Sequence, residues 1–121
     1  MKVRFAIAAL FLCLCTSFAH AEFTWKTWID YRNNGLPKMQ ADVLHLYVAA
    51  IASTLSSVNG ALEYRHDRKL YCLKDSKKVL QVWDVEQLLD YAQAGGEAEF
   101  APETPLSLAA LLKAQQIYPC R

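Results

Sequence analysis

Hydrophobic positions spaced by three and four residues recur along most of the chain and predict a helical fold. The longest such run extends from Val43 to Val58, where the apolar side chains would share one face of a helix. Pro37 precedes this run. Asn59-Gly60 is expected to end the helix, because Gly60 can adopt the left-handed conformation of a C-terminal cap. The predicted buried stripe consists of Val43, Leu46, Tyr47, Ala50, Ile51, Thr54, Leu55 and Val58.

A second helix is expected to begin at Asp84, whose carboxylate can accept hydrogen bonds from the first turn. Gln87 would complete a capping box with Asp84, and Gly95-Gly96 would end the helix. The apolar positions of this helix predict one buried face, made of Val85, Leu88, Leu89 and Ala92.

Two further helices complete the prediction. One would begin at Thr104-Pro105, a cap followed by proline at the first helical position, and Pro119 would limit it. Its apolar side would consist of Leu108, Ala109, Leu111 and Leu112. The other, shorter helix is expected near residues 23–31, where Trp25, Trp28 and Ile29 share a face.

Residues 71–73 and 79–83 are less regular and could be extended, because the second stretch alternates apolar and β-branched residues. All three tryptophans, Trp25, Trp28 and Trp83, are expected in the core. The prediction is an all-α protein, a small bundle of four to five helices with one disulfide.

The first 21 residues have the three parts of a cleavable secretory signal. Lys2 and Arg4 supply a positive start, an apolar run from Phe5 to Leu14 follows, and Ala19-His20-Ala21 is a small-x-small cleavage pattern. The apolar run is too short to span a bilayer, and we expect no second segment that could do so. The mature domain would comprise residues 22–121 and would lie in the periplasm.

Charge and cysteine content narrow the function classes. Without Lys2 and Arg4, the 13 basic residues fall to 11 against 12 acidic ones, a balance that gives no support to nucleic-acid binding. The mature chain keeps Cys72 and Cys120, which have one intramolecular pairing in a disulfide-permissive compartment. The alternative is two buried free thiols.

Groups suited to catalysis are sparse, and we expect no catalytic residues, no metal ligands and no cofactor. The mature chain has two histidines, and neither has metal-ligand spacing to a cysteine or carboxylate. His45 is expected to contact neighbours on the flank of the long helix. His66 lies in the charged run Arg65-His66-Asp67-Arg68-Lys69, which is either a solvated connection or a patch for an acidic partner.

The stretch from Tyr71 to Cys120 resembles the Rap1a/Tai family of type VI secretion immunity proteins. Members typically have an aromatic-Cys pair, a helix with a tyrosine near its end, a helix opened by proline and a closing aromatic-Pro-Cys. The corresponding residues here are Tyr71-Cys72, Leu88-Leu89-Asp90-Tyr91, Pro105 and Ile117-Tyr118-Pro119-Cys120. Upstream, residues 47–55 are similar to the family's Tyr-x-x-Gly-Val-x-Asp-Ala-Leu helix, with Ala50 for the glycine and Ser53 for the aspartate.

The chain also departs from the family pattern. The family's Pro-x-Gly-Val-Thr turn is replaced by residues 74–78, Lys-Asp-Ser-Lys-Lys. Many members have a second cysteine pair, with one cysteine in the first helix and one at about Leu44. Both of these cysteines are absent here. The chain therefore looks like a divergent member.

The resemblance implies a periplasmic protein that binds and blocks a cell-wall-degrading amidase effector, without enzyme activity of its own. A homodimer is compatible with this role. Such a protein needs a rigid scaffold and an exposed loop that fills the effector's active-site cleft. Residues 64–69 and 74–78 are the expected loops. The predicted partner-binding residues are Arg65, His66, Arg68, Lys69, Lys74, Asp75 and Lys77.

Three other readings compete with immunity. A small acid-activated chaperone would also be a short helical domain with one disulfide, but it would need carboxylates whose protonation loosens the fold. A small lipid or peptidoglycan hydrolase would need a general base that the sequence does not supply. An orphan periplasmic member of the family would have no cognate toxin.

Overall fold

The regular elements of the protein are helices. The computed structural model describes residues 22–74, 79–95 and 99–121, and the described residues contain four α-helices and no strand. In chain order these are α2 (Trp25–Asn34), α3 (Lys38–Tyr64), α4 (Val82–Ala94) and α5 (Leu106–Ile117). The all-α prediction is confirmed. The predicted extended pieces are not strands: residues 71–73 are irregular, and Val82 and Trp83 begin α4.

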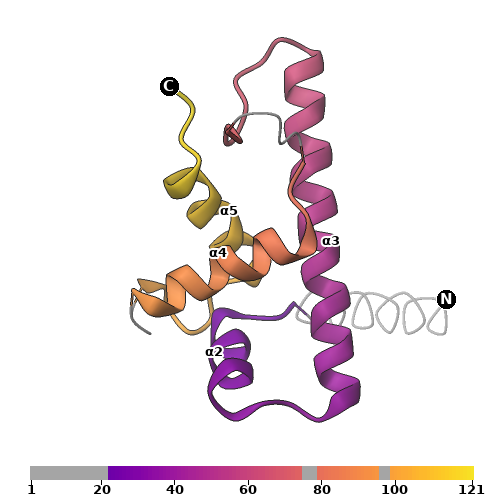
Figure 1. Cartoon of the computed structure of the whole chain (residues 1–121), viewed down its shortest axis with the longest axis vertical. Coiled ribbons are helices and arrows are strands. Elements are labelled where there is room, and N and C mark those ends of the chain that lie inside the picture. Colours follow the sequence, from indigo (N-terminus) through magenta and orange to yellow (C-terminus); the bar gives the residue numbers. More distant parts are fainter. Residues whose placement is uncertain (1–21, 75–78, 96–98) are drawn as a thin grey trace, which may run out of the picture.

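The long helix α3 runs along one side of the protein, and the other described helices all lie on the same side of it (Figure 1). In that view α4 begins beside the middle of α3 and extends away from it, α2 lies beside the N-terminal half of α3, and α5 lies next to α4. The core lies between these helices and includes Trp25 and Trp28 of α2, which are almost completely buried. The predicted face of α4 is buried as a whole, and the prediction for α2 is confirmed by the burial of Trp25, Trp28 and Ile29. Trp83 is 57% exposed, so its prediction as a core residue is wrong.

The buried face of α3 differs from the predicted one. Leu46 is 68% exposed and Val43 is 49% exposed, whereas Leu44 and Val48 are buried. The observed buried set is Leu44, Val48, Ile51, Ala52, Leu55 and Asn59. The sequence did not separate the two faces because no Asp, Glu, Lys or Arg occurs between Asp42 and Glu63. With apolar and small polar residues all around the helix, the positions of α4 and α5 determine which face is covered.

The same correction applies to α5. Leu108 and Leu112, predicted to face the core, are exposed. Ala109 is buried as predicted, and the other buried residues of α5 are Leu106, Ala110, Lys113 and Ala114. Alanine side chains allow a close approach of neighbouring helices, which explains why Ala109, Ala110 and Ala114, rather than Leu108 and Leu112, line the buried side.

Two helix starts are displaced from their predicted positions. Gln81, not Asp84, is the N-terminal cap of α4. The Asp84 carboxylate accepts a hydrogen bond from the Gln81 backbone N–H at 2.7 Å, so Asp84 is the N3 residue of a capping box that begins at Gln81. Similarly, Pro105 is the cap residue of α5 rather than its first helical residue. Gly95 follows the last residue of α4, as predicted.

By length and composition, α3 is apolar enough to cross a membrane: an 18-residue window has a mean hydropathy of 1.4. The prediction that no second segment meets this criterion is therefore wrong. Length and composition alone do not distinguish a membrane span from the central helix of a globular domain, and 28% of this window is buried inside the protein.

Candidate functional site

The C-terminal end of α3 begins the candidate site. The helix continues through Gly60 and ends at Tyr64, so the predicted end at Asn59-Gly60 is wrong. The Asp67 N–H donates to the Leu62 carbonyl at 2.8 Å, and the His66 N–H donates to the Glu63 carbonyl at 3.0 Å. This pair of hydrogen bonds is a Schellman motif. The left-handed position that it requires is occupied by His66, with φ of 60°.

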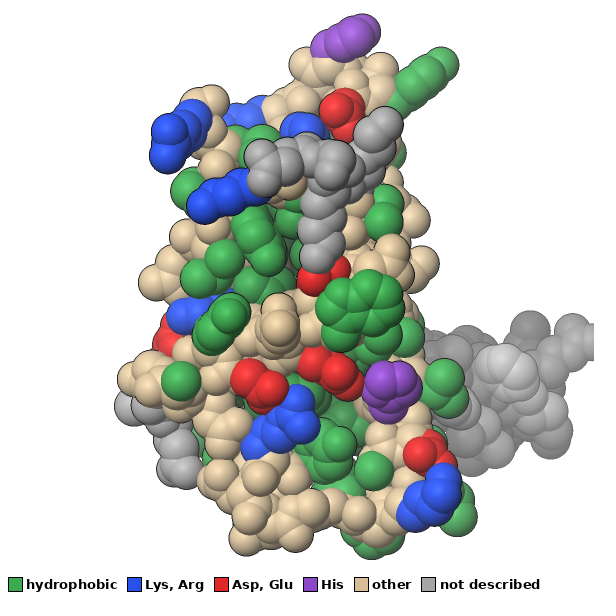
Figure 2. Space-filling view, in the orientation of Figure 1, with side chains coloured by type: hydrophobic (Ala, Val, Ile, Leu, Met, Phe, Trp, Pro, Cys, Tyr) green, Lys and Arg blue, Asp and Glu red, His purple; other side chains and the backbone are tan. Residues whose placement is uncertain are grey.

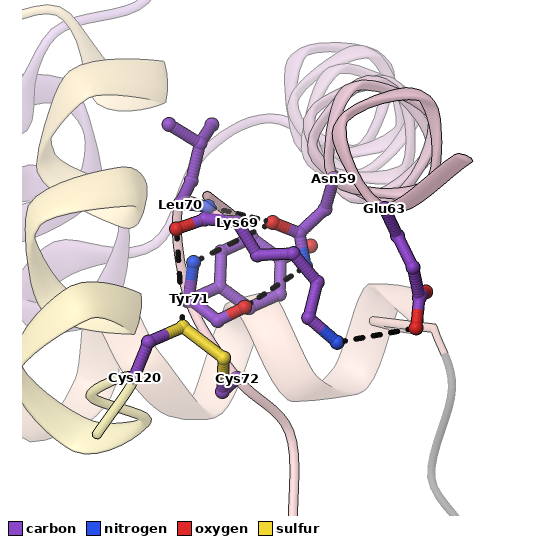
Figure 3. Close-up of a disulfide and its surroundings, with 7 residues drawn as sticks. All are labelled: Asn59, Glu63, Lys69, Leu70, Tyr71, Cys72 and Cys120. Carbon is purple, nitrogen blue, oxygen red and sulfur yellow. Dashed lines mark hydrogen bonds and ion pairs between the residues drawn. A yellow bond between two sulfur atoms is a disulfide. The ribbon is translucent and has the colours of Figure 1, made fainter. Parts of the chain in front are cut away.

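Asn59 of α3 fixes the chain that returns from this turn. Its side chain is buried, its Nδ2 donates to the Tyr71 carbonyl at 2.9 Å, and its Oδ1 accepts from the Leu70 N–H at 2.8 Å. Figure 3 shows the amide of Asn59 pointing from α3 to this segment. One side chain thus satisfies a backbone donor and a backbone acceptor that no helix or strand pairs.

The disulfide holds the same segment from the other side. Cys72 and Cys120 are bonded, with an S–S distance of 2.02 Å, so the predicted pair is confirmed and the free-thiol alternative is excluded. The Cys72 N–H also donates to the Tyr118 carbonyl at 2.8 Å. The Cys120 sulfur lies 3.8 Å from the Lys69 carbonyl oxygen, a contact without a shared proton because both sulfurs are bonded (Figure 3).

Tyr71 lies between these two anchors and is almost completely buried. Burial raises the pKa of its phenol above the ordinary value, and hydrogen bonding with Ser56 opposes this only in part. Tyr71 therefore remains neutral over the physiological pH range. Its side chain packs into the hydrophobic core and anchors this segment there. We refer to residues 65–74 as the braced loop.

The braced loop is rich in cations. Arg65 forms an ion pair with Asp67 at 2.9 Å, and Lys69 lies 3.4 Å from Glu63, but both pairs are solvent-exposed. Arg68 and Lys74 form no ion pair within the described residues. Figure 2 shows Lys and Arg side chains gathered at the end of the molecule where α3 ends. Exposed pairs of this kind contribute little to stability, so the cations are free to exchange partners.

The structure thus brings five of the predicted partner-binding residues onto one loop: Arg65, His66, Arg68, Lys69 and Lys74. Asp75 and Lys77, predicted in the second loop, lie outside the described residues. The sequence prediction missed Gln115 and Pro119, which line a groove of about 360 Å³ with Arg68, Lys69, Leu70 and Cys120. The available signal was the Cys72–Cys120 pairing itself, since it places the end of α5 beside the loop.

Outside the braced loop, the Glu22 carboxylate accepts hydrogen bonds from the Tyr47 and Ser107 hydroxyls. His45 contacts Glu86 through Nδ1 at 3.0 Å, which confirms its prediction as a histidine that contacts its neighbours. Among residues 22–74, 79–95 and 99–121, no three His, Cys, Asp or Glu side chains are grouped so that they could hold a metal ion. The braced loop is therefore the best-defined candidate site.

The left-handed conformation of His66 predicts opposite effects for two substitutions. His66→Gly is expected to raise the free energy of unfolding by up to about 1 kcal/mol, because glycine adopts φ of 60° without steric strain. His66→Val is expected to lower it by about 1 kcal/mol, because a β-branched side chain is disfavoured there. Urea denaturation of both variants measures the difference. Equal stability of the two variants would show that the turn does not impose this conformation.

No family model, curated protein or solved structure matches the chain. The functional interpretation therefore depends on the residues of the chain and on the geometry of the braced loop. These define an all-α protein with a single described disulfide and a cationic loop held at the end of its longest helix.

Proposed function

We propose that the protein is a periplasmic immunity-type binding protein that neutralises a cell-wall amidase effector by occluding its active site. One observation carries the proposal: the cationic loop 65–74 is fixed at its start by a Schellman turn, in its middle by Asn59 and near its end by the disulfide. A rigid loop loses little conformational entropy when it binds, which favours tight association with a concave surface.

The positive charge of the braced loop supports a protein partner with an acidic surface. The braced loop contains four Lys and Arg residues, within a chain that is close to neutral overall. A local positive patch of this kind accelerates and orients encounter with an acidic surface. Because occlusion of a cleft needs contacts and no reacting groups, the role does not require catalytic residues in this chain.

The amidase is the more specific part of the proposal and comes from the resemblance to the Rap1a/Tai family. The family-like motifs Tyr71-Cys72 and Tyr118-Pro119-Cys120 lie in the two segments that the disulfide joins. The expected secretory signal would deliver the protein to the compartment where cell-wall-degrading toxins act.

A co-expression experiment tests the role directly. Each candidate peptidoglycan amidase toxin encoded by the source organism is directed to the periplasm of a host, with and without this protein. We expect this protein to prevent lysis by at least one toxin. Lysis that continues with every candidate toxin, despite verified export of the protein, would refute the immunity role.

Charge reversal tests the assigned surface. The triple variant Arg65→Glu, Arg68→Glu and Lys69→Glu is expected to bind the amidase at least about tenfold more weakly than the wild type. The reason is that attractive contacts with an acidic surface become repulsive. The melting temperature should change little, because all three side chains take part only in exposed pairs or in none within the described residues. Calorimetric titration gives the affinity, and circular dichroism gives the melting temperature.

A matched control separates the loop from overall charge. The double variant Lys26→Glu and Lys38→Glu alters exposed residues of α2 and α3, and it changes the net charge by as much as Arg68→Glu with Lys69→Glu. The control should leave the affinity within about twofold at physiological salt, where charges far from the interface are screened. Equal weakening by the two double variants would contradict a specific role of the braced loop.

A second candidate function is supported by the exposed apolar residues of α3. Met39, Val43 and Leu46 are exposed apolar residues near the N-terminal end of α3, as a chaperone that holds unfolded clients would require. Aggregation of a reduced or acid-unfolded client protein, followed by light scattering at pH 7 and at pH 2–3, tests this role. Suppression only at low pH would support an acid-activated chaperone, and no suppression at either pH would exclude it.

A further inference from the structure

The groove beside the disulfide is lined by cations and contains no acidic side chain among its described residues. Arg68, Lys69 and Leu70 line one side, and the α5 residue Gln115 with Pro119 and Cys120 lines the other. None of these six residues carries a carboxylate, and the polar side chains among them are two cations and one amide. The groove therefore offers hydrogen-bond donors and positive charge to whatever enters it.

Within the described residues, neither cation of the groove is held by a buried ion pair. Arg68 has no ion-pair partner among the described residues, and the Lys69 Nζ lies 3.4 Å from its nearest carboxylate oxygen, on Glu63. The Lys69–Glu63 pair is the longest of the ion pairs in the described part of the chain. An incoming anion would thus displace water and a loose surface contact, rather than a buried pair.

The walls of the groove are held in place before any ligand arrives. On one side, Leu70 is fixed by its N–H bond to Asn59. On the other, Cys120 is fixed by the disulfide to Cys72, whose N–H bonds the Tyr118 carbonyl. The Cys72–Cys120 bond joins the two walls covalently, so their separation does not depend on the flexible side chains of Arg68 and Lys69.

We propose that this groove is a receptor for an acidic side chain, Asp or Glu, presented by a protein partner. The planar guanidinium of Arg68 can bind a carboxylate through two parallel hydrogen bonds, and the Lys69 ammonium and the Gln115 amide can add further donors. Leu70 and Pro119 provide apolar contacts for the methylene groups of a glutamate. A polyanion such as nucleic acid is disfavoured, because the mature chain as a whole carries slightly more acidic than basic residues. The inference rests on the proposed function only in taking the partner to be a protein.

The test uses the oxidised mature chain and a defined probe. An acetylated, amidated hexaglutamate peptide is titrated into isotopically labelled protein while backbone amide signals are followed by NMR. Hexaserine with the same end groups is the uncharged control, and sodium acetate tests the free carboxylate. We expect hexaglutamate to shift the signals of Leu70 and Gln115, hexaserine to shift neither, and acetate to shift the same signals only at much higher concentration.

Two single variants distinguish the groove from the general charge of the loop. Arg68→Ala is expected to weaken hexaglutamate binding about fivefold, the upper end for an exposed ion pair. Arg65→Ala removes the same charge from the same loop, but Arg65 pairs with Asp67 and does not line the groove. It should weaken binding less than twofold.

Equal weakening by Arg68→Ala and Arg65→Ala, or shifts centred on Lys26 and Lys38, would overturn the receptor. The outcome is independent of the protection experiment. If hexaglutamate binds as expected but no toxin is neutralised, the receptor stands and the amidase role fails. If a toxin is neutralised but hexaglutamate does not bind in the groove, the immunity role stands and the receptor fails.

Discussion

Replacement of both cysteines, Cys72→Ser with Cys120→Ser, is expected to lower the free energy of unfolding by about 4 kcal/mol. The bond closes a loop with a sequence separation of 48, and its removal returns that conformational freedom to the unfolded chain. Because small domains have total stabilities of roughly 5–15 kcal/mol, the loss should be visible as a large fall in the urea midpoint.

The location of the disulfide predicts a second consequence. The bond holds the braced loop against the end of α5. The core residues of α3 and α4 pack against each other and do not contact each other through the disulfide. The double variant should therefore remain helical by circular dichroism at low temperature, while its binding to the partner weakens. The wild-type protein under reducing conditions provides the control, since it should resemble the double variant. A urea midpoint unchanged within error in both samples would show that the disulfide contributes no stability.

The second large effect is expected on α3. Leu44→Ala should lower the free energy of unfolding by about 3 kcal/mol, because Leu44 is 1% exposed and its truncation leaves a cavity among core side chains. Leu46→Ala, two positions along the same helix, should change it by less than about 0.5 kcal/mol, because Leu46 is 68% exposed. Both substitutions have the same chemistry and nearly the same effect on helix propensity.

This pair of variants compares the two faces of α3 in one measurement. Urea denaturation monitored by the buried tryptophans Trp25 and Trp28 reports the global transition. A large loss for Leu46→Ala would mean that the exposed face of α3 is covered in solution, and analytical ultracentrifugation of the wild type would then reveal the covering copy. A small loss for Leu44→Ala would contradict the arrangement of the core.

The helices themselves could be predicted because their signals are local. The three-and-four spacing of apolar residues in α4 predicted the apolar part of its buried face, because polar residues occupy most of the other side. For α3 the helix was predicted but its orientation was not. With no Asp, Glu, Lys or Arg between Asp42 and Glu63, the pattern is compatible with more than one buried face.

Part of the candidate site could be predicted because its signals are also local or compositional. The cations at residues 65–69 form a conspicuous run, and the pairing of Cys72 with Cys120 was predicted because only two cysteines lie outside the expected secretory signal. Asn59, in contrast, looked like a helix-ending residue, and its role as a buried anchor for Leu70 and Tyr71 depends on how the chain returns from α3. Gln115 likewise enters the groove only because the disulfide brings α5 to the loop.

The sequence by itself determined the helical class, the cysteine pairing and the cationic character of residues 65–69, because each depends on neighbours in the chain or on composition. The tertiary structure decided which face of α3 and α5 is buried, that His66 rather than Gly60 provides the left-handed turn, and that a groove forms beside Cys120. These features depend on contacts between segments far apart in the chain, and the free energy of packing selects among local alternatives that the residue pattern leaves nearly equal.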